Sequence, residues 1–402
     1  MRLLAIVALI NLACFMLTGC WDMDEITELA PIMGLGFDVG THLGTIKVSA
    51  LITPPTRAGA DGGAVGVPNL RVLTVEAATV TEALSLLLGH IRRELFLMHL
   101  GFLVFGEELA RAGIGGVVAG VHGKIEIRGS VLAVVAAGSA EEVLRARSGI
   151  GGAPGEDILR LLSNLRRASL GRLVAFYTVV TTLTGIGSEL ALPILDLTPL
   201  RIEAAGHQPA GGTGQQGQQL MEVSIGRTAL FVRDRWVHEL DVFQTQIFTL
   251  LTGDVDQGAM TIVHPTAPGG VMAVRFLRFR PHFKPHVSPG GSVALHVNIE
   301  IDASLTETRG GYDLREYGPK PITTVLEDSV TAQVTALLTL MQQLGSDGLS
   351  IGNMIYRRQP TTWGHLEPRW SELYRQMTAS VKTKARLRDT SILARLFAVR
   401  RQ

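Results

Sequence analysis

The chain has 402 residues, of which 46% are hydrophobic and 18% charged, with 45 Gly and 17 Pro. This length and composition allow two or three packed cores and exclude an intrinsically disordered chain. Lys and Arg total 37 against 36 Asp and Glu, a net charge of +1. The overall charge therefore gives no reason to expect a nucleic acid or a strongly charged substrate as a partner.

The N-terminus carries the features of an export signal. The basic Arg2 precedes an apolar run over residues 3–17, which is too short to span a bilayer comfortably. The run leads into Leu17-Thr18-Gly19-Cys20, the aliphatic, small, Gly, Cys order of a lipobox. We therefore predict a signal peptide over 1–19 and a mature chain held by acyl lipid on Cys20 at the outer face of the plasma membrane. An N-terminal membrane anchor with an incidental Cys is the alternative.

The cysteine count agrees with that interpretation. The chain has two cysteines, Cys14 and Cys20, and cleavage before Cys20 would remove the first and leave the second acylated. No thiol pair would remain for a disulfide or a Cys-metal site. We expect no cofactor apart from the covalent lipid, and firm anchoring where two or three acyl chains are attached. Beyond Cys20 no run of 18 apolar residues occurs, so no membrane span is expected there.

The segment 20–202 is predicted to form one or two α/β subdomains. Short β-branched and aliphatic runs indicate strands, and between them the periodicity of 81–93 indicates a helix. Further helices are expected at 107–112, 140–147 and 157–170. The strands are expected at 32–37, 45–52, 70–75, 102–105 and 131–136.

A Gly- and Gln-rich stretch at 203–219 is predicted to be a linker or long exposed loop, because it lacks bulky apolar residues. The segment 220–402 after it is predicted to be an α+β domain of strands and one long helix at 321–344, with an apolar stripe at helical spacing. One strand is expected at 271–279. The predicted class is α+β (mixed α/β), with several mixed sheets and packed helices in more than one domain.

Four blocks of sequence resemble the Ger(x)C family, the lipoprotein C subunits of spore germinant receptors in Gram-positive spore formers. They occur in the family's order over nearly the whole mature chain. The 203–219 loop is longer, and 311–320 looser, than the family pattern. The blocks are Gly19-Cys20-Trp21-Asp22-Met23-Asp24-Glu25-Ile26, residues 99–110 (HLGFLVFGEELA), residues 226–240, and Asp347-Gly348-Leu349-Ser350-Ile351-Gly352 followed by Pro360, Trp363 and Trp370.

The resemblance implies a non-enzymatic receptor subunit that is needed for germination in response to nutrients. It implies membrane-embedded A and B subunits as partners and a place on the inner membrane of a dormant spore. Two other classes of protein remain as alternatives, namely a solute-binding lipoprotein of a transporter and an exported hydrolase. The first predicts a two-lobed cleft; the second requires a catalytic set, and no GxSxG or SxxK motif occurs.

Two groups of residues are candidates for contact with partners. Trp21, Asp22 and Glu25 follow the lipidated Cys20, where an indole suits the headgroup region and the acids suit a basic surface; a solvated tether explains them equally. The second group follows the long helix, where the Trp rings either close a core or face a partner. It comprises Asp347, Gly348, Gly352, Trp363 and Trp370.

The second half of the chain contains several histidines and, after Trp370, a basic C-terminal segment. His264, His282, His286 and His296 could suggest a metal site, but Pro281 and Pro285 prevent the helical spacing of a zinc helix, and no HExxH motif or nearby Cys occurs, so we expect no metal site. We expect no catalytic residues either. After Trp370 basic residues dominate, including Lys382, Lys384, Arg386 and Arg388. They suit anionic lipid headgroups or, alternatively, a solvated strand face.

Overall fold

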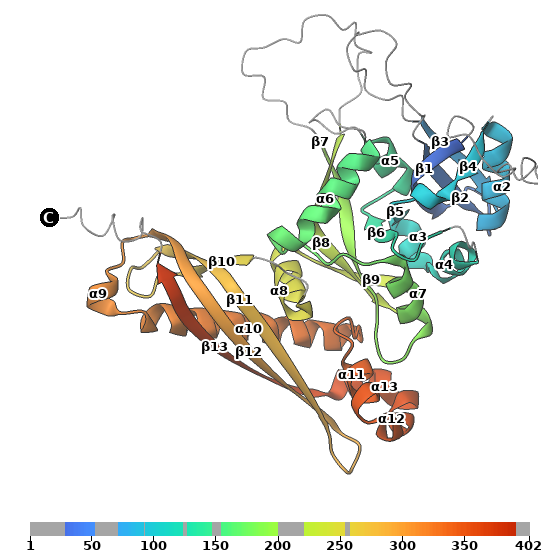
Figure 1. The fold of residues 1–402 in the computed structure, drawn as a ribbon. Coiled ribbons are helices and arrows are strands. Elements are labelled where there is room, and N and C mark those ends of the chain that lie inside the picture. The colour runs from blue at the N-terminus through green and yellow to red at the C-terminus, as the bar shows by residue number, and fades with distance from the viewer. Residues whose placement is uncertain are drawn as a thin grey trace, which may run out of the picture.

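The computed structural model describes residues 29–52, 71–91, 93–123, 127–146, 154–199, 221–253 and 258–390. The predicted signal peptide 1–19, the lipid site Cys20 and the predicted linker 203–219 lie outside these ranges. Two sheets organise the chain, one in each half, and Figure 1 shows them side by side with helices between and around them.

The first sheet has nine strands among the described residues, in the order β3-β2-β1-β5-β6-β7-β8-β9, with β4 paired to β1. The central pairs β1–β5, β5–β6 and β6–β7 are parallel, and the outer pairs are antiparallel. The sheet is therefore mixed, and its parallel centre is buried on both faces. The strands are β1 (Leu29–Val39), β2 (Ile46–Ile52), β3 (Arg71–Ala77), β4 (Glu94–Phe96), β5 (Phe102–Phe105), β6 (Leu132–Ala136), β7 (Ala191–Pro199), β8 (Met221–Val232) and β9 (Arg235–Leu240).

Helices cover both faces of this sheet, which makes the first half a three-layer unit. One face packs on helices that share a core with Phe37, Leu103 and Phe231, and the other on helices that share a core with Phe102 and Val134. The first group comprises α2 (Val80–His90), α3 (Glu107–Ala112), α4 (Gly115–His122) and α7 (Phe176–Thr184); the second comprises α5 (Ala140–Arg145) and α6 (Pro154–Ala168).

The segment predicted as a linker connects neighbouring strands of this one sheet. β7 and β8 lie on either side of it and pair antiparallel from Ala191↔Leu230 to Pro199↔Met221. The first sheet thus continues past residue 220 into β8 and β9. After β9, Asp241 and Gln244 form a reciprocal capping box that begins α8 (Val242–Thr252) and leads the chain to the second sheet.

The second sheet has the order β10-β11-β12-β13, with β13 parallel to β12. Its inner face packs on α10, whose apolar stripe includes Ile322, Leu326, Val330 and Val334. Gly345 ends α10 in the left-handed conformation with φ of 78°. The elements of this half are β10 (Gly258–Val263), β11 (Val271–Val287), β12 (Val293–Arg309), α9 (Leu314–Tyr317), α10 (Lys320–Leu344), α11 (Ile351–Arg358), α12 (Pro360–Leu366), α13 (Trp370–Gln376) and β13 (Thr378–Thr390), with short 3₁₀ turns at Leu97–His99 and Glu367–Arg369.

Strand β11 is longer than the sequence predicts. The strand was expected to end at 279, but it reaches Val287 and accommodates two prolines, with Pro281 paired to Ile299 and Pro285 to Leu295. The reason is that β10 pairs with β11 only as far as Phe276. Beyond that point no described strand pairs with this edge of β11, and an unpaired edge tolerates a residue without an N–H. The mixed sheets and packed helices confirm the predicted α+β class.

Candidate functional site

The two halves meet where the loop between α7 and β7 crosses the segment between α10 and α11. The N–H of Glu189 donates to the carbonyl oxygen of Asp347 at 3.0 Å, and the N–H of Asn353 donates to that of Gly187 at 2.8 Å. Backbone-to-backbone bonds of this kind fix one chain segment against the other whatever the side chains are. We call the contact between residues 185–190 and 345–353 the junction.

Two glycines allow the backbones to approach closely at the junction. Gly187 has a positive φ of 63°, and a Cβ atom added there would lie 2.6 Å from the carbonyl carbon of Gly352. A Cβ added at Gly352 would lie 2.7 Å from the Cα of Gly187 and 2.8 Å from ring atoms of both Trp363 and Trp370. Neither position has room for a side chain, so the approach requires glycine at both.

Asp347 is the buried polar centre of the junction, with 2% of its surface exposed. One carboxylate oxygen accepts the N–H of Ile351 at 2.8 Å, and the other accepts the N–H of Gly352 at 2.8 Å and the indole N–H of Trp370 at 3.2 Å. These bonds satisfy the first amides of α11. Burial raises the pKa of Asp347 to about 7, while the three hydrogen bonds oppose the rise.

Aromatic side chains close the other side of this carboxylate. The rings of Trp363 and Trp370 lie 5.1 Å apart, and those of Trp370 and Tyr374 lie 5.9 Å apart. The hydroxyl of Tyr374 donates to the carbonyl of Ser346 at 3.1 Å, and the hydroxyl of Ser346 donates to the carbonyl of Phe231 in β8 at 2.7 Å. A chain of hydrogen bonds thus runs from α13 through the end of α10 to the first sheet.

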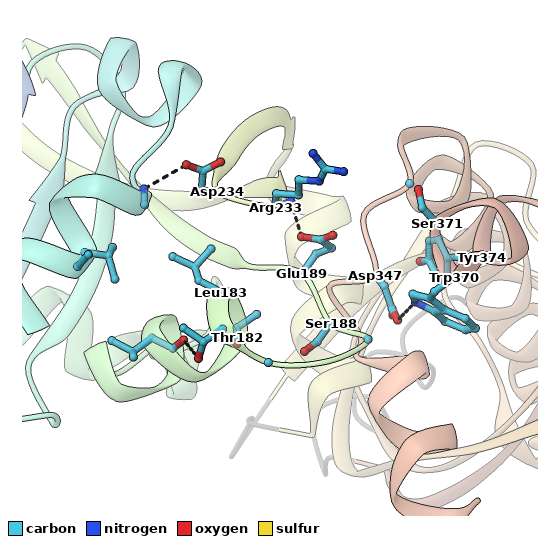
Figure 2. Close-up of a pocket in the computed structure, with 18 of the residues that line it drawn as sticks. Thr182, Leu183, Ser188, Glu189, Arg233, Asp234, Asp347, Trp370, Ser371 and Tyr374 are labelled. Carbon is cyan, nitrogen blue, oxygen red and sulfur yellow. Dashed lines mark hydrogen bonds between the residues drawn. The ribbon is translucent and has the colours of Figure 1, made fainter. Parts of the chain in front are cut away.

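A pocket of about 600 Å³ opens beside the junction. Figure 2 shows Glu189, Arg233 and Ser188 between the helices of the first half and the side chains of Trp370, Ser371 and Tyr374. Its walls come from α4, α7, the β8–β9 turn, the end of α10 and α13. Pockets at domain boundaries are common places for a ligand or for a partner's side chain.

Glu189 is a pocket carboxylate with an oxygen that has no hydrogen-bond partner among the described residues. Its other oxygen accepts the N–H of Arg233 at 2.5 Å. Burial raises the pKa of Glu189 to about 7, and the bond from Arg233 and the charge of its guanidinium oppose the rise. By contrast, Asp234 uses its carboxylate to accept the N–H of Gly115 at 3.2 Å, which ties the β8–β9 turn to α4. The pocket can therefore offer one carboxylate oxygen of Glu189 and one of Asp234 to a hydrogen-bonding or cationic group.

The junction brings together all the predicted site residues that follow the long helix. Trp363 is 2% exposed and belongs to the second core, whereas Trp370 lines the pocket. A Cβ at Gly348 would meet its nearest neighbour at 3.3 Å, so this glycine is not confined as Gly352 is. Cys20, Trp21, Asp22 and Glu25 lie outside the described residues, and their roles stay predictions.

Sequence reasoning missed the residues on the opposite side of the junction. No sequence motif includes Gly187, Glu189 or Tyr374, and the contacts of these residues join segments that are far apart in the chain. The Gly185-Ile186-Gly187 turn was the local signal available, since glycines at that spacing mark a tight backbone.

The described residues contain no group of three or more His, Cys, Asp or Glu side chains placed to hold a metal ion. His264, one of the histidines in the second half, serves its own turn: one ring nitrogen accepts the N–H of Ala267 at 2.9 Å, and the other lies 3.1 Å from the carbonyl of Gly311. No helix within the described ranges is both long and apolar enough to cross a membrane.

Comparison with known proteins relates both halves to one family. Residues 22–197 match a family model described as the spore germination protein N-terminal domain, and residues 226–391 match one described as spore germination B3/GerAC like, C-terminal. The chain is 22% identical over 378 residues to the protein YfkR of Bacillus subtilis (strain 168), with 92% of each covered. It is 22% identical over 409 residues to spore germination protein KC of the same organism, covering 97% of this chain and 96% of the relative.

The fold is shared with a solved structure as well. The crystal structure of the GerBC protein matches with a TM-score of 0.51 and 15% identity, over 91% of this chain and 99% of that one. The two family models follow one another in chain order and together cover both sheets. This confirms the resemblance seen in the sequence: the chain belongs to the Ger(x)C family of spore germination proteins.

Proposed function

We propose that the chain is the non-enzymatic C subunit of a nutrient germinant receptor, needed for spores to germinate in response to nutrients. The observation that carries the proposal is the match of both halves, in order, to the two spore germination models. The alignment with spore germination protein KC over 97% of the chain supports the same assignment for the whole molecule.

We further propose that lipid on Cys20 holds the chain on the outer face of the inner spore membrane, beside membrane-embedded A and B subunits. The lipobox Leu17-Thr18-Gly19-Cys20 supports the lipid, and the family supports the partners. In this proposal Trp21, Asp22 and Glu25 lie at the membrane surface, where an indole ring is stable among headgroups.

The junction suits a binding subunit because its polar groups serve mainly to join the two halves. The carboxylate of Asp347 is occupied by three donors, and the hydroxyl of Tyr374 by a carbonyl. In the pocket, Glu189 and Asp234 each present one carboxylate oxygen without a hydrogen-bond partner among the described residues. A subunit held in one shape by such a junction can present fixed surfaces to its partners.

Isolation of the chain from spore membranes tests the assignment. A C-terminally tagged chain in its native host, solubilised in mild detergent, is expected to bring with it two multi-pass proteins encoded beside it. The same chain carrying Cys20→Ala serves as the control, since it loses the lipid without altering any residue that the structure describes. Co-isolation with transport permease subunits instead would overturn the receptor proposal and support the solute-binding alternative. Membership of the spore germination family does not favour that alternative.

A further inference from the structure

The face of the second sheet opposite α10 is exposed and strongly basic. Along β13 the residues Val381, Thr383 and Ala385 alternate toward α10, which leaves the even-numbered side chains outside. The same alternation in β11 sends Phe279 and Phe283 inward. We define the basic face by its exposed cations: Arg275, Arg278, Arg280 and Lys284 of β11, and Lys382, Lys384, Arg386 and Arg388 of β13.

Strand register places these cations in rows across the sheet. One row is Arg280, Glu300 and Lys384, and the next is Arg278, Asp302 and Arg386. A third is His282, Asn298 and Lys382. Each row therefore has basic groups on its outer strands, with its acid or amide on the central strand β12.

The carboxylates in these rows are too few to neutralise the cations. Asp302 is largely enclosed and pairs with Arg388 at 2.9 Å and with Arg278 at 3.6 Å. Glu300 is the second acid, and Glu307 and Arg309, of opposite charge, are exposed at the far end of β12. The salt bridges among the described residues leave most of the other cations of the face without a carboxylate partner. They are Arg275, Arg280, Lys284, Lys382 and Lys384, while Arg386 shares the charge of Asp302 with Arg278 and Arg388.

This concentration of charge is unlike the rest of the chain. The basic face has eight cations, and its rows contain two acids, although the chain as a whole carries a net charge of only +1. The remainder of the molecule is therefore acidic on balance. A molecule with this charge distribution orients in the field of an anionic surface so that its basic side faces that surface.

We propose that the basic face lies against an anionic lipid bilayer and that phospholipid headgroups supply the missing negative charges. Neighbouring strands are about 4.8 Å apart and alternate residues about 6.7 Å apart, so the cations form a flat, regular array. Headgroups in a fluid bilayer can move to meet such an array. Basic residues near an anionic leaflet are each attracted to it.

The chemistry of the face favours lipid over a protein or a nucleic acid. Protein interfaces centre on apolar or aromatic anchors and are depleted in Lys, whereas the defined face has no aromatic member. Proteins that bind single-stranded nucleic acid place aromatic rings among the cations as stacking platforms, and Phe279 and Phe283 turn away from this surface.

Binding to vesicles tests this inference separately from the proposed receptor role and from the lipid on Cys20. A chain lacking residues 1–20 keeps every residue that the structure describes, including both sheets and their cores. The probes are vesicles of phosphatidylcholine alone and of equal parts phosphatidylcholine and phosphatidylglycerol. The test variant combines Arg280→Gln, Lys284→Gln, Lys382→Gln and Lys384→Gln.

A matched control removes the same charge elsewhere. It combines Arg71→Gln, Arg128→Gln, Arg357→Gln and Arg358→Gln, which are exposed and form no salt bridge with a described residue. We expect the unaltered chain to sediment with anionic vesicles only. The test variant should lose about tenfold or more of that binding, while the control keeps most of it.

Salt provides a second measurement that needs no variant. Raising it from about 0.1 M to about 1 M shortens the Debye length from about 10 Å to about 3 Å, and should release the unaltered chain from the vesicles. Equal loss in test and control variants would overturn the inference. So would binding to both kinds of vesicle alike, or no binding to anionic vesicles at low salt.

Discussion

The N–H of Asn353 donates a 2.8 Å hydrogen bond to the carbonyl oxygen of Gly187, and this bond joins the two halves of the chain. It forms only because the backbone at Gly187 passes within van der Waals reach of Gly352. The junction therefore depends on the absence of a side chain at Gly187 and at Gly352.

Gly187→Ala and Gly352→Ala should each destabilise the protein by about 2 kcal/mol, because the added methyl group overlaps backbone or Trp ring atoms. Gly364→Ala is the control, since a Cβ in that position of α12 meets nothing within 4 Å and alanine is the better helix former. Urea unfolding measures all three. Equal stability of Gly187→Ala and the parent chain would show that the junction is looser than described.

The structure also shows what the sequence could and could not predict. The stripe from Ile322 to Met341 marked α10 correctly, because a 3.6-residue period is a local property. The predicted end of β11 at 279 was wrong, because the strand continues to Val287 through pairing with β12, which joins segments that the local sequence pattern does not relate. Asp347 was found through the resemblance, but Glu189 was not, because a contact between distant segments leaves no local pattern.

A pair of tryptophan variants separates hydrogen bonding from packing at the junction. Trp370→Phe removes the indole donor to Asp347 and should cost about 2 kcal/mol above pH about 7, where this carboxylate is charged. Trp363→Phe removes an indole N–H that has no partner among the described residues, so its cost arises from lost ring volume alone. Thermal unfolding at two pH values distinguishes them: only the Trp370 change should alter the pH dependence of stability.

Protonation of Glu189 should make stability depend on pH. Its pKa is about 7 in the fold and 4.5 when exposed, so the folded state binds more protons between these values. Stability should then be greatest below pH about 4.5 on this account and fall as the pH rises to about 7. The pKa shift of Glu189 changes the free energy of unfolding by about 3 kcal/mol at most.

Glu189→Gln tests that pH dependence because it removes the charge and keeps the size. The variant should be more stable than the parent above pH about 7 and should lose part of the decline between pH about 4.5 and about 7. Glu316→Gln, an exposed carboxylate on α9, is a suitable control. If the free energy of unfolding depended on pH in the same way for Glu189→Gln and the parent chain, a raised pKa of Glu189 would be contradicted.

Cys20→Ala should abolish lipid attachment, because this thiol is the acyl acceptor of the lipobox. Metabolic labelling with a fatty acid measures the loss, and the membrane fraction of the chain should fall with it. A variant that still takes up the label would refute the lipoprotein prediction.

Germination of spores that lack the chain is the most direct test of the proposed function. Deletion in the native host, in a strain without a duplicate receptor, should block the response to a particular nutrient. A receptor-independent agent should still germinate the same spores, and the intact gene should restore the nutrient response. Deletion spores that answer every nutrient normally would contradict the assignment of this chain as a germinant receptor subunit.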